Sequence, residues 1–276
     1  MGNILQHWLF LSSLEWKKFS KNTVIIILII LYVLISPVAL FTAKDMFEGA
    51  PPPFPSVNSF FEFPLVWEYQ GYVASWFVAF ILGFAIIYMF TSEVSNRTLR
   101  QNIITGLSKR DFFLSKITSV IYLSLMGTVL FFVSSVIIGL LHTPGSDMEL
   151  IMDNNFALLR CFLMCLGYMS FALFLSVLIR KGMLVILNYF MYVNILEPLL
   201  RQVQFFFFKD RSMIFWPMNT FEDLFPLPFY RLPDTWIEES FGFSALQSTW
   251  EAIGFSSVYI VLFISLSWYF FNKKDV

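Results

Sequence analysis

Six long apolar stretches constrain the fold of this chain more than any other feature of its sequence. A helix needs about 20 apolar residues to cross a hydrocarbon core of about 30 Å, and it satisfies its own backbone hydrogen bonds in lipid. The stretches of sufficient length are residues 23–42, 71–91, 117–141, 156–179, 183–204 and 250–271. Because only 13% of the residues are charged, the chain also lacks the polar surface of a soluble domain. We therefore predict an all-α integral membrane protein with a single domain over residues 1–276.

Lysine and arginine are distributed unevenly among the segments that connect these stretches. Twelve of the 18 cations fall in the N-terminal segment, the second and fourth connections and the C-terminus: Lys17, Lys18, Lys21, Arg97, Arg100, Lys109, Arg110, Lys116, Arg180, Lys181, Lys273 and Lys274. The acidic residues run the other way, since four of the 19 accompany these cations. Connections that stay in the cytoplasm carry the excess of lysine and arginine. We therefore expect a multi-pass protein with both termini in the cytoplasm.

The segment before the first apolar stretch predicts a helix that lies in the plane of the membrane. Ile4, Leu5, Trp8, Leu9 and Leu14 share one face of such a helix, and lysines follow at its end. An apolar face with cations beside it is typical of a helix at the membrane interface.

The third external connection, residues 205–249, is rich in aromatic residues and prolines. Two interpretations stay open here. The segment is either a folded external cap or a pair of short helices that re-enter the outer leaflet, where protein would have to shield their backbone. The four phenylalanines at 205–208 are expected to form the lipid-facing end of the fifth apolar stretch.

The most basic segment, SEVSNRTLRQNIITGLSKRDFFLSK, covers residues 92–116 and connects the second and third stretches. Residues 93–104 suit a helix with Glu93 near its N-terminus, as the helix dipole favours. Gly106 is expected to end this helix. Ser108 and Asp111 have the spacing of a capping box for the following helix. Contact with lipid head groups explains the charge of the segment but not this internal order.

The order of Glu93, Arg97-Thr98-Leu99 and GLSKRDFFLSK resembles the cytoplasmic segment of type-2 ABC transporter permeases. In that family this segment is the coupling helix, which docks on the subunit that hydrolyses ATP. The site residues that the resemblance implies for ATPase coupling are Glu93, Arg97, Thr98, Leu99, Arg100, Gly106, Ser108, Lys109 and Lys116. The sequence departs from the family pattern at Arg97 and Ser115, where the family usually has glycine.

The resemblance also implies a function and a set of partners. The chain would be the transmembrane subunit of an ABC exporter in the cytoplasmic membrane of a prokaryote, paired with a second or homologous permease, two ATPase subunits and membrane lipids. ATP and Mg²⁺ would bind the ATPase, because this chain has no G-x-x-x-x-G-K-[ST] motif. No cofactor in this chain and no nucleic-acid partner are expected.

Two other functions are alternatives to this one. The first is a permease-like subunit that transmits force or signal to envelope machinery without moving a substrate. The second is an intramembrane enzyme, which is disfavoured because the sequence holds no recognisable set of catalytic residues.

Glu197 and Arg201 stand out in the fifth stretch, because an acid four residues before a base can pair with it on a helix. The pair either fixes the outer end of the span or forms an external gate between two permeases. Pro198 removes a backbone donor and is expected to loosen the helix at this point.

A few further polar and sulfur-containing residues have simpler interpretations. Cys161, Met164 and Cys165 offer soft ligands for Cu(I), but ordinary apolar packing is the favoured interpretation. Asn188 and Asn194 are expected to hydrogen-bond between helices.

Overall fold

Six apolar helical units dominate the computed structural model, which describes residues 2–47, 57–145, 147–153, 156–226 and 231–274. The units long and apolar enough to cross a membrane are Thr23–Thr42, Val66–Ser95, Lys109–His142, Met148–Ile179, Gly182–Phe208 and Thr249–Lys273. No strand occurs in the described part of the chain. The structure therefore confirms an all-α membrane protein with six spans.

The helices are α1 (Gly2–Phe19), α2 (Thr23–Phe47), α3 (Val66–Phe77), α4 (Gly83–Ser95), α5 (Thr98–Ile104), α6 (Lys109–His142), α7 (Met148–Met152), α8 (Ala157–Ile179), α9 (Gly182–Met191), α10 (Glu197–Phe208), α11 (Pro217–Glu222), α12 (Arg231–Phe241) and α13 (Thr249–Lys273). Two π-helical turns, η2 (Val78–Leu82) and η3 (Tyr192–Leu196), interrupt the second and fifth spans, and two 3₁₀ turns are η1 (Val57–Phe60) and η4 (Arg211–Phe215).

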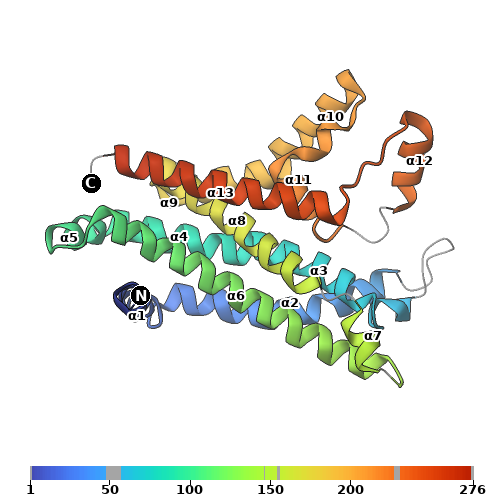
Figure 1. The fold of residues 1–276 in the computed structure, drawn as a ribbon, viewed down its shortest axis with the longest axis horizontal. Coiled ribbons are helices and arrows are strands. Elements are labelled where there is room, and N and C mark those ends of the chain that lie inside the picture. The colour runs from blue at the N-terminus through green and yellow to red at the C-terminus, as the bar shows by residue number, and fades with distance from the viewer. Residues whose placement is uncertain (1, 48–56, 146, 154–155, 227–230, 275–276) are drawn as a thin grey trace.

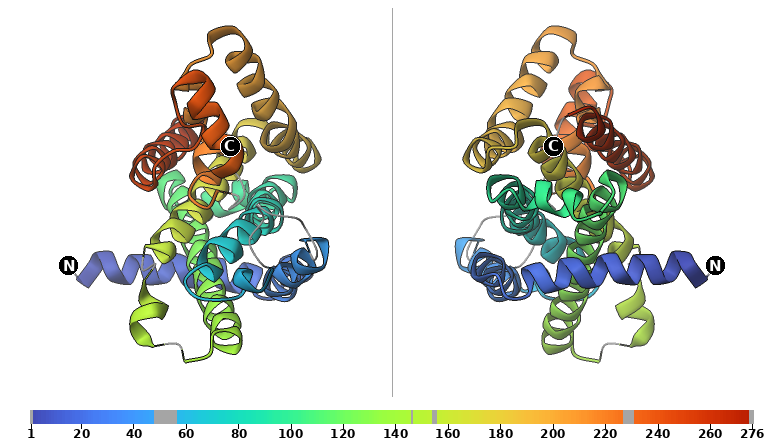
Figure 2. Two further views of the ribbon diagram at one scale, coloured as in Figure 1. Left: turned by 90° about the vertical axis from the view of Figure 1, so that its right-hand side faces the viewer. Right: turned by 90° about the vertical axis from the view of Figure 1, so that its left-hand side faces the viewer.

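The two ends of the bundle carry different elements (Figure 1). The α5 end holds α1, α5 and the last turn of α13, and the α7 end holds α7 and α12. Helix α1 lies across the long axis of the bundle, as Figure 2 shows. This orientation agrees with the predicted in-plane helix. Among the α1 side chains that the structure describes, Leu11, Glu15 and Phe19 are buried, whereas Leu9 is exposed; those of Ile4 and Leu5 lie outside the described part.

Helix α8 is the central element of the core and packs against α4, α6 and α13. Its buried residues include Cys161, Met164 and Cys165, and both cysteines are free thiols. Gly127 of α6 approaches this region closely, because a Cβ added there would lie 3.2 Å from the Cys165 sulfur. These three side chains thus fill the helix interface, as the apolar interpretation expected.

Residues 205–249 divide between the two interpretations that the sequence left open. Helix α11 packs within the bundle against α8 and α13, whereas α12 lies beyond it at the α7 end (Figure 1). Glycines make room for the returning segment: a Cβ on Gly167 would lie 2.4 Å from the ring of Phe221, and one on Gly71 would lie 2.1 Å from Phe225. Neighbouring helices therefore cover α11, as the re-entrant interpretation expected of this segment.

Two expectations for the fifth span had different outcomes. The amide nitrogens of Asn188 and Asn194 donate to the carbonyls of Leu184 and Phe190 in their own span, so in the described chain these donors do not make the predicted contacts between helices. Each amide is satisfied by the carbonyl one turn back, which a helix always offers. The predicted loosening near Pro198 is confirmed, since η3 directly precedes α10 and its proline.

Candidate functional site

The segment with the family resemblance forms a helix, α5, that is separate from the span before it. The prediction of one helix over residues 93–104 is wrong. Arg97 adopts a left-handed conformation with φ of 57° and turns the chain between α4 and α5. Glu93 consequently belongs to the last turn of α4 rather than to the start of α5. The Thr98 hydroxyl donates to the Glu93 carbonyl at 3.2 Å and stabilises this turn.

The end of α5 follows the predicted pattern. Gly106 has φ of +109°, a conformation that favours glycine. Its N–H donates to Ile103, and the N–H of Leu107 donates to Asn102, which together make a Schellman motif. Ser108 then caps α6, because its hydroxyl accepts the Asp111 N–H at 3.0 Å. Both predicted helix boundaries are confirmed.

Helix α5 has one buried face and one exposed face. Leu99 is 4% exposed and packs into the bundle, so it anchors the helix. The exposed side chains recur at helical spacing and belong to Arg97, Arg100, Gln101 and Ile104; we call them the α5 surface. Ile104 is 75% exposed, although it is the most apolar of the four. Two cations beside an exposed apolar side chain are typical of a surface that binds another protein.

A buried ion cluster lies directly beneath α5. Lys116 of α6 donates to Glu15 of α1 at 2.7 Å and also to Glu93 of α4. Lys18 contacts the same two carboxylates at 3.3 Å from each. Ser115 and Ser119 complete the cluster by donating to Glu15 at 2.9 and 3.0 Å. The cluster therefore joins α1, α4 and α6 through charge-assisted hydrogen bonds.

Pairing favours the charged form of Glu15 despite its burial. Burial opposes ionisation of Glu15, but Lys116 and Lys18 hold its pKa below the ordinary value. The ammonium of Lys116 also lies 5.1 Å from the ring centre of Phe19 and 5.0 Å from that of Phe112. The ion cluster thus provides a fixed connection between the in-plane helix and the two spans that hold α5.

The structure places the charged residues of the predicted coupling set at three different locations. Glu93 and Lys116 lie in the buried ion cluster, so neither can contact a partner directly. Arg97 and Arg100 lie on the α5 surface. Lys109 donates to the Lys274 carbonyl at 3.2 Å and so connects the start of α6 to the end of the last span.

Sequence reasoning missed three participants at this end. Ile104 was not singled out, and neither was Glu15, which follows Leu11 and precedes Phe19 by four residues on the buried face of α1. An acid in the middle of an apolar face is a signal that could have indicated a buried partner. The third is His7, which contacts Asp111 at 2.8 Å while its side chain stays 46% exposed.

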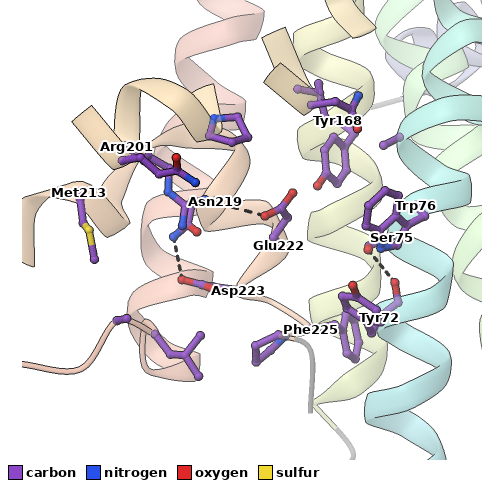
Figure 3. Close-up of a pocket in the computed structure, with 18 of the residues that line it drawn as sticks. Tyr72, Ser75, Trp76, Tyr168, Arg201, Met213, Asn219, Glu222, Asp223 and Phe225 are labelled. Atoms are coloured by element: carbon purple, nitrogen blue, oxygen red, sulfur yellow. Dashed lines mark hydrogen bonds and ion pairs between the residues drawn. The ribbon is translucent and has the colours of Figure 1, made fainter. Parts of the chain in front are cut away.

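A cavity of about 410 Å³ lies between the second, fourth and fifth spans and α11 (Figure 3). Its aromatic wall includes Tyr72 and Trp76 of α3 and Tyr168 of α8. Across from them lie the charged side chains of Glu222 and Asp223. Burial raises the pKa of Asp223, which lies outside the six spans, to about 7.

Glu197 and Arg201 do not form the predicted ion pair. Arg201 instead approaches Glu222 of α11 at 4.0 Å. Glu197 is fully buried, and its carboxylate accepts the Asn219 backbone N–H at 2.8 Å. The return of α11 into the bundle explains this change of partners. It brings the Asn219 N–H to Glu197 and the Glu222 carboxylate to Arg201.

These features define a multi-pass helical membrane protein that presents a short helix between its second and third spans. A comparison with known families matches residues 11–195 to the ABC-2 family transporter proteins. The match runs from α1 to η3 and covers more than half of the chain, including the ion cluster and α5. The chain therefore belongs to the ABC-2 family of transporter proteins, which confirms the resemblance in its sequence. A comparison with curated proteins found no match.

Proposed function

We propose that this protein is the transmembrane permease subunit of an ATP-binding cassette exporter in the cytoplasmic membrane of a prokaryote. Two ATPase subunits would bind and hydrolyse ATP with Mg²⁺. A second copy of this chain, or a homologous permease, would complete the membrane part. Family membership supports the role of a membrane transport component that receives its energy from a partner.

The observation that carries this proposal is the α5 surface. Arg97, Arg100, Gln101 and Ile104 are exposed at the end of the bundle that also holds both chain ends. The cations identified in the sequence gather at this same end, which supports its placement in the cytoplasm. A cytoplasmic ATPase would reach α5 without entering the membrane.

The buried side of α5 supports the transmission of force. Leu99 anchors the helix, and the ion cluster beneath it joins α1, α4 and α6. A push on α5 would therefore move these helices together rather than bend a flexible connection. Rigid-body movement of this kind is a common means of coupling a partner's chemistry to a membrane helix bundle.

Co-purification with the candidate ATPase tests the proposal. Wild-type permease should retain the ATPase, and a variant carrying Arg100→Glu and Ile104→Asp should retain about tenfold less, since central contacts dominate binding. The control is Lys209→Glu, which reverses an exposed cation on the segment after α10. Retention of the ATPase by the double variant would exclude α5 as the docking site. Failure of the wild type to retain any ATPase would overturn the permease assignment.

A further inference from the structure

The cavity between the second, fourth and fifth spans has two unlike walls (Figure 3). Tyr72, Trp76 and Tyr168 present aromatic side chains on one side. Glu222 and Asp223 present carboxyl groups on the other. Residues Ala79 and Phe80 of η2, and Val193 and Asn194 of η3, also line it. The cavity thus lies beside both π-helical turns, and such turns occur frequently at functional sites.

Acidic groups outnumber basic groups around this cavity. Arg201 is the one cation among the residues that line the described cavity, and it stands 4.0 Å from Glu222. Asp223 instead accepts from neutral donors, the Asn219 amide at 2.9 Å and the Gln247 backbone N–H at 3.2 Å. Glu197, a further buried acid, accepts the Asn219 backbone N–H.

Exposure indicates which carboxyl group a ligand could reach. The side chain of Glu222 is 49% exposed although it lines the cavity, whereas Asp223 is buried. Trp76 is likewise 49% exposed. Figure 3 shows the Glu222 carboxyl between Arg201, its ion-pair partner, and the wall that holds Tyr168 and Trp76. A ligand between these groups would contact a carboxylate and aromatic faces together.

This combination discriminates between ligand classes. The faces of aromatic rings attract cations, and a carboxylate adds a direct electrostatic attraction. An anion of the same shape would be repelled by the acidic excess. A neutral apolar molecule would gain no electrostatic attraction from the carboxyl groups.

We propose that this cavity binds a hydrophobic organic cation, with its charge beside Glu222 and its apolar part against Tyr72, Trp76 and Tyr168. The proposal deepens the proposed function by naming a substrate class, and as a substrate site it rests on that function. Binding itself requires only the folded permease.

Equilibrium binding of tetraphenylphosphonium to the purified permease in an uncharged detergent tests the proposal. Tetraphenylborate, which has the same four phenyl groups and the opposite charge, is the matched ligand control. The permease should bind the cation and should bind the anion at least about tenfold more weakly, because charge is the main difference between the two. Equal binding of both ions would show apolar partitioning only and would overturn the proposal.

Two variants on opposite walls locate the site. Glu222→Gln and Trp76→Ala should each weaken tetraphenylphosphonium binding by about tenfold. Their controls are Glu238→Gln on α12 and Trp16→Ala on α1, both exposed residues outside the cavity, which should bind as the wild type does. Thermal melting shows which variants are folded. If one of the two is not, the variant on the opposite wall still tests the site. Wild-type affinity in either folded cavity variant would overturn the assignment.

The binding assay and the co-purification assay fail independently. Cation binding without ATPase retention would overturn the proposed permease function and leave a cation-binding membrane protein. ATPase retention without cation binding would leave the permease function intact and overturn the substrate class.

Discussion

The ammonium of Lys116 contacts the carboxylate of Glu15 at 2.7 Å, although the two residues lie 101 positions apart. The contact connects a helix that lies across the bundle to a helix that spans it. Glu93 approaches the same ammonium from a third helix. One lysine at the base of the third span therefore holds together the elements around α5.

Replacing Lys116 with methionine should strongly destabilise the protein. The change keeps an unbranched side chain but removes the ammonium that Glu15 and Glu93 share, and leaves the more distant Lys18 as their remaining cation. Removing one partner of a buried ion pair costs about 3–5 kcal/mol. Thermal melting of the purified variant measures the loss. A triple variant that adds Glu15→Gln and Glu93→Gln should recover most of the stability, and a single variant that melts with the wild type would contradict the ion cluster.

The two faces of α5 should respond differently to the same type of substitution. Leu99→Ala removes a buried side chain and should lower the free energy of unfolding by about 2–5 kcal/mol. Ile104→Ala removes a side chain that is 75% exposed and should change it by no more than about 0.5 kcal/mol. Chemical denaturation in detergent compares the two. Similar losses in both variants would show that the faces are assigned wrongly.

The conformation of Gly106 makes a specific prediction about the end of α5. Its φ of +109° strains any residue with a Cβ, although the structure has open space around it. Gly106→Ala should therefore cost about 1–2 kcal/mol of stability. Gly254→Ala is the matched control, because Gly254 also has open space but lies in the regular helix α13. That change should stabilise the protein by up to about 1 kcal/mol, so opposite signs are expected in the melting temperature.

The partner of Arg201 can be identified by charge exchange. Arg201→Glu should destabilise the packing of α11, and Glu222→Arg in the same chain should restore part of the loss. Glu197→Arg should not, because Glu197 is fully buried and accepts a backbone N–H. Melting of the two double variants decides between them. Recovery with Glu197→Arg would favour the pairing that local spacing suggests.

Cysteine labelling checks the orientation in the membrane. A cysteine in place of Ser95 at the α5 end should resist an impermeant thiol reagent added to intact cells, and one in place of Ser240 on α12 should react. Both serines are exposed. Ser95 is preferable to Ser108, whose hydroxyl caps α6. Labelling of the Ser95 site from outside would show that the predicted orientation is wrong.

The sequence by itself determined the class of the protein and its local helix boundaries. Apolar length predicted six spans, and the glycine and serine at 106 and 108 predicted where α5 ends and α6 begins. Local rules also predicted the in-plane helix and the loosened fifth span. These features depend on lipid solubility, backbone conformation and capping within a few residues, so a single segment contains the information.

Only the tertiary structure decided which charges meet. Local spacing paired Glu197 with Arg201, but the returning α11 brings Glu222 to the arginine. Glu93 and Lys116 appear in one basic segment, yet both are buried against Glu15 of a helix that precedes the first span. A buried charge takes the partner that packing brings within hydrogen-bond distance, and that partner can lie anywhere in the chain. For this reason the segment predicted to couple to an ATPase could be located from its sequence, whereas its exposed surface and its anchor required the fold.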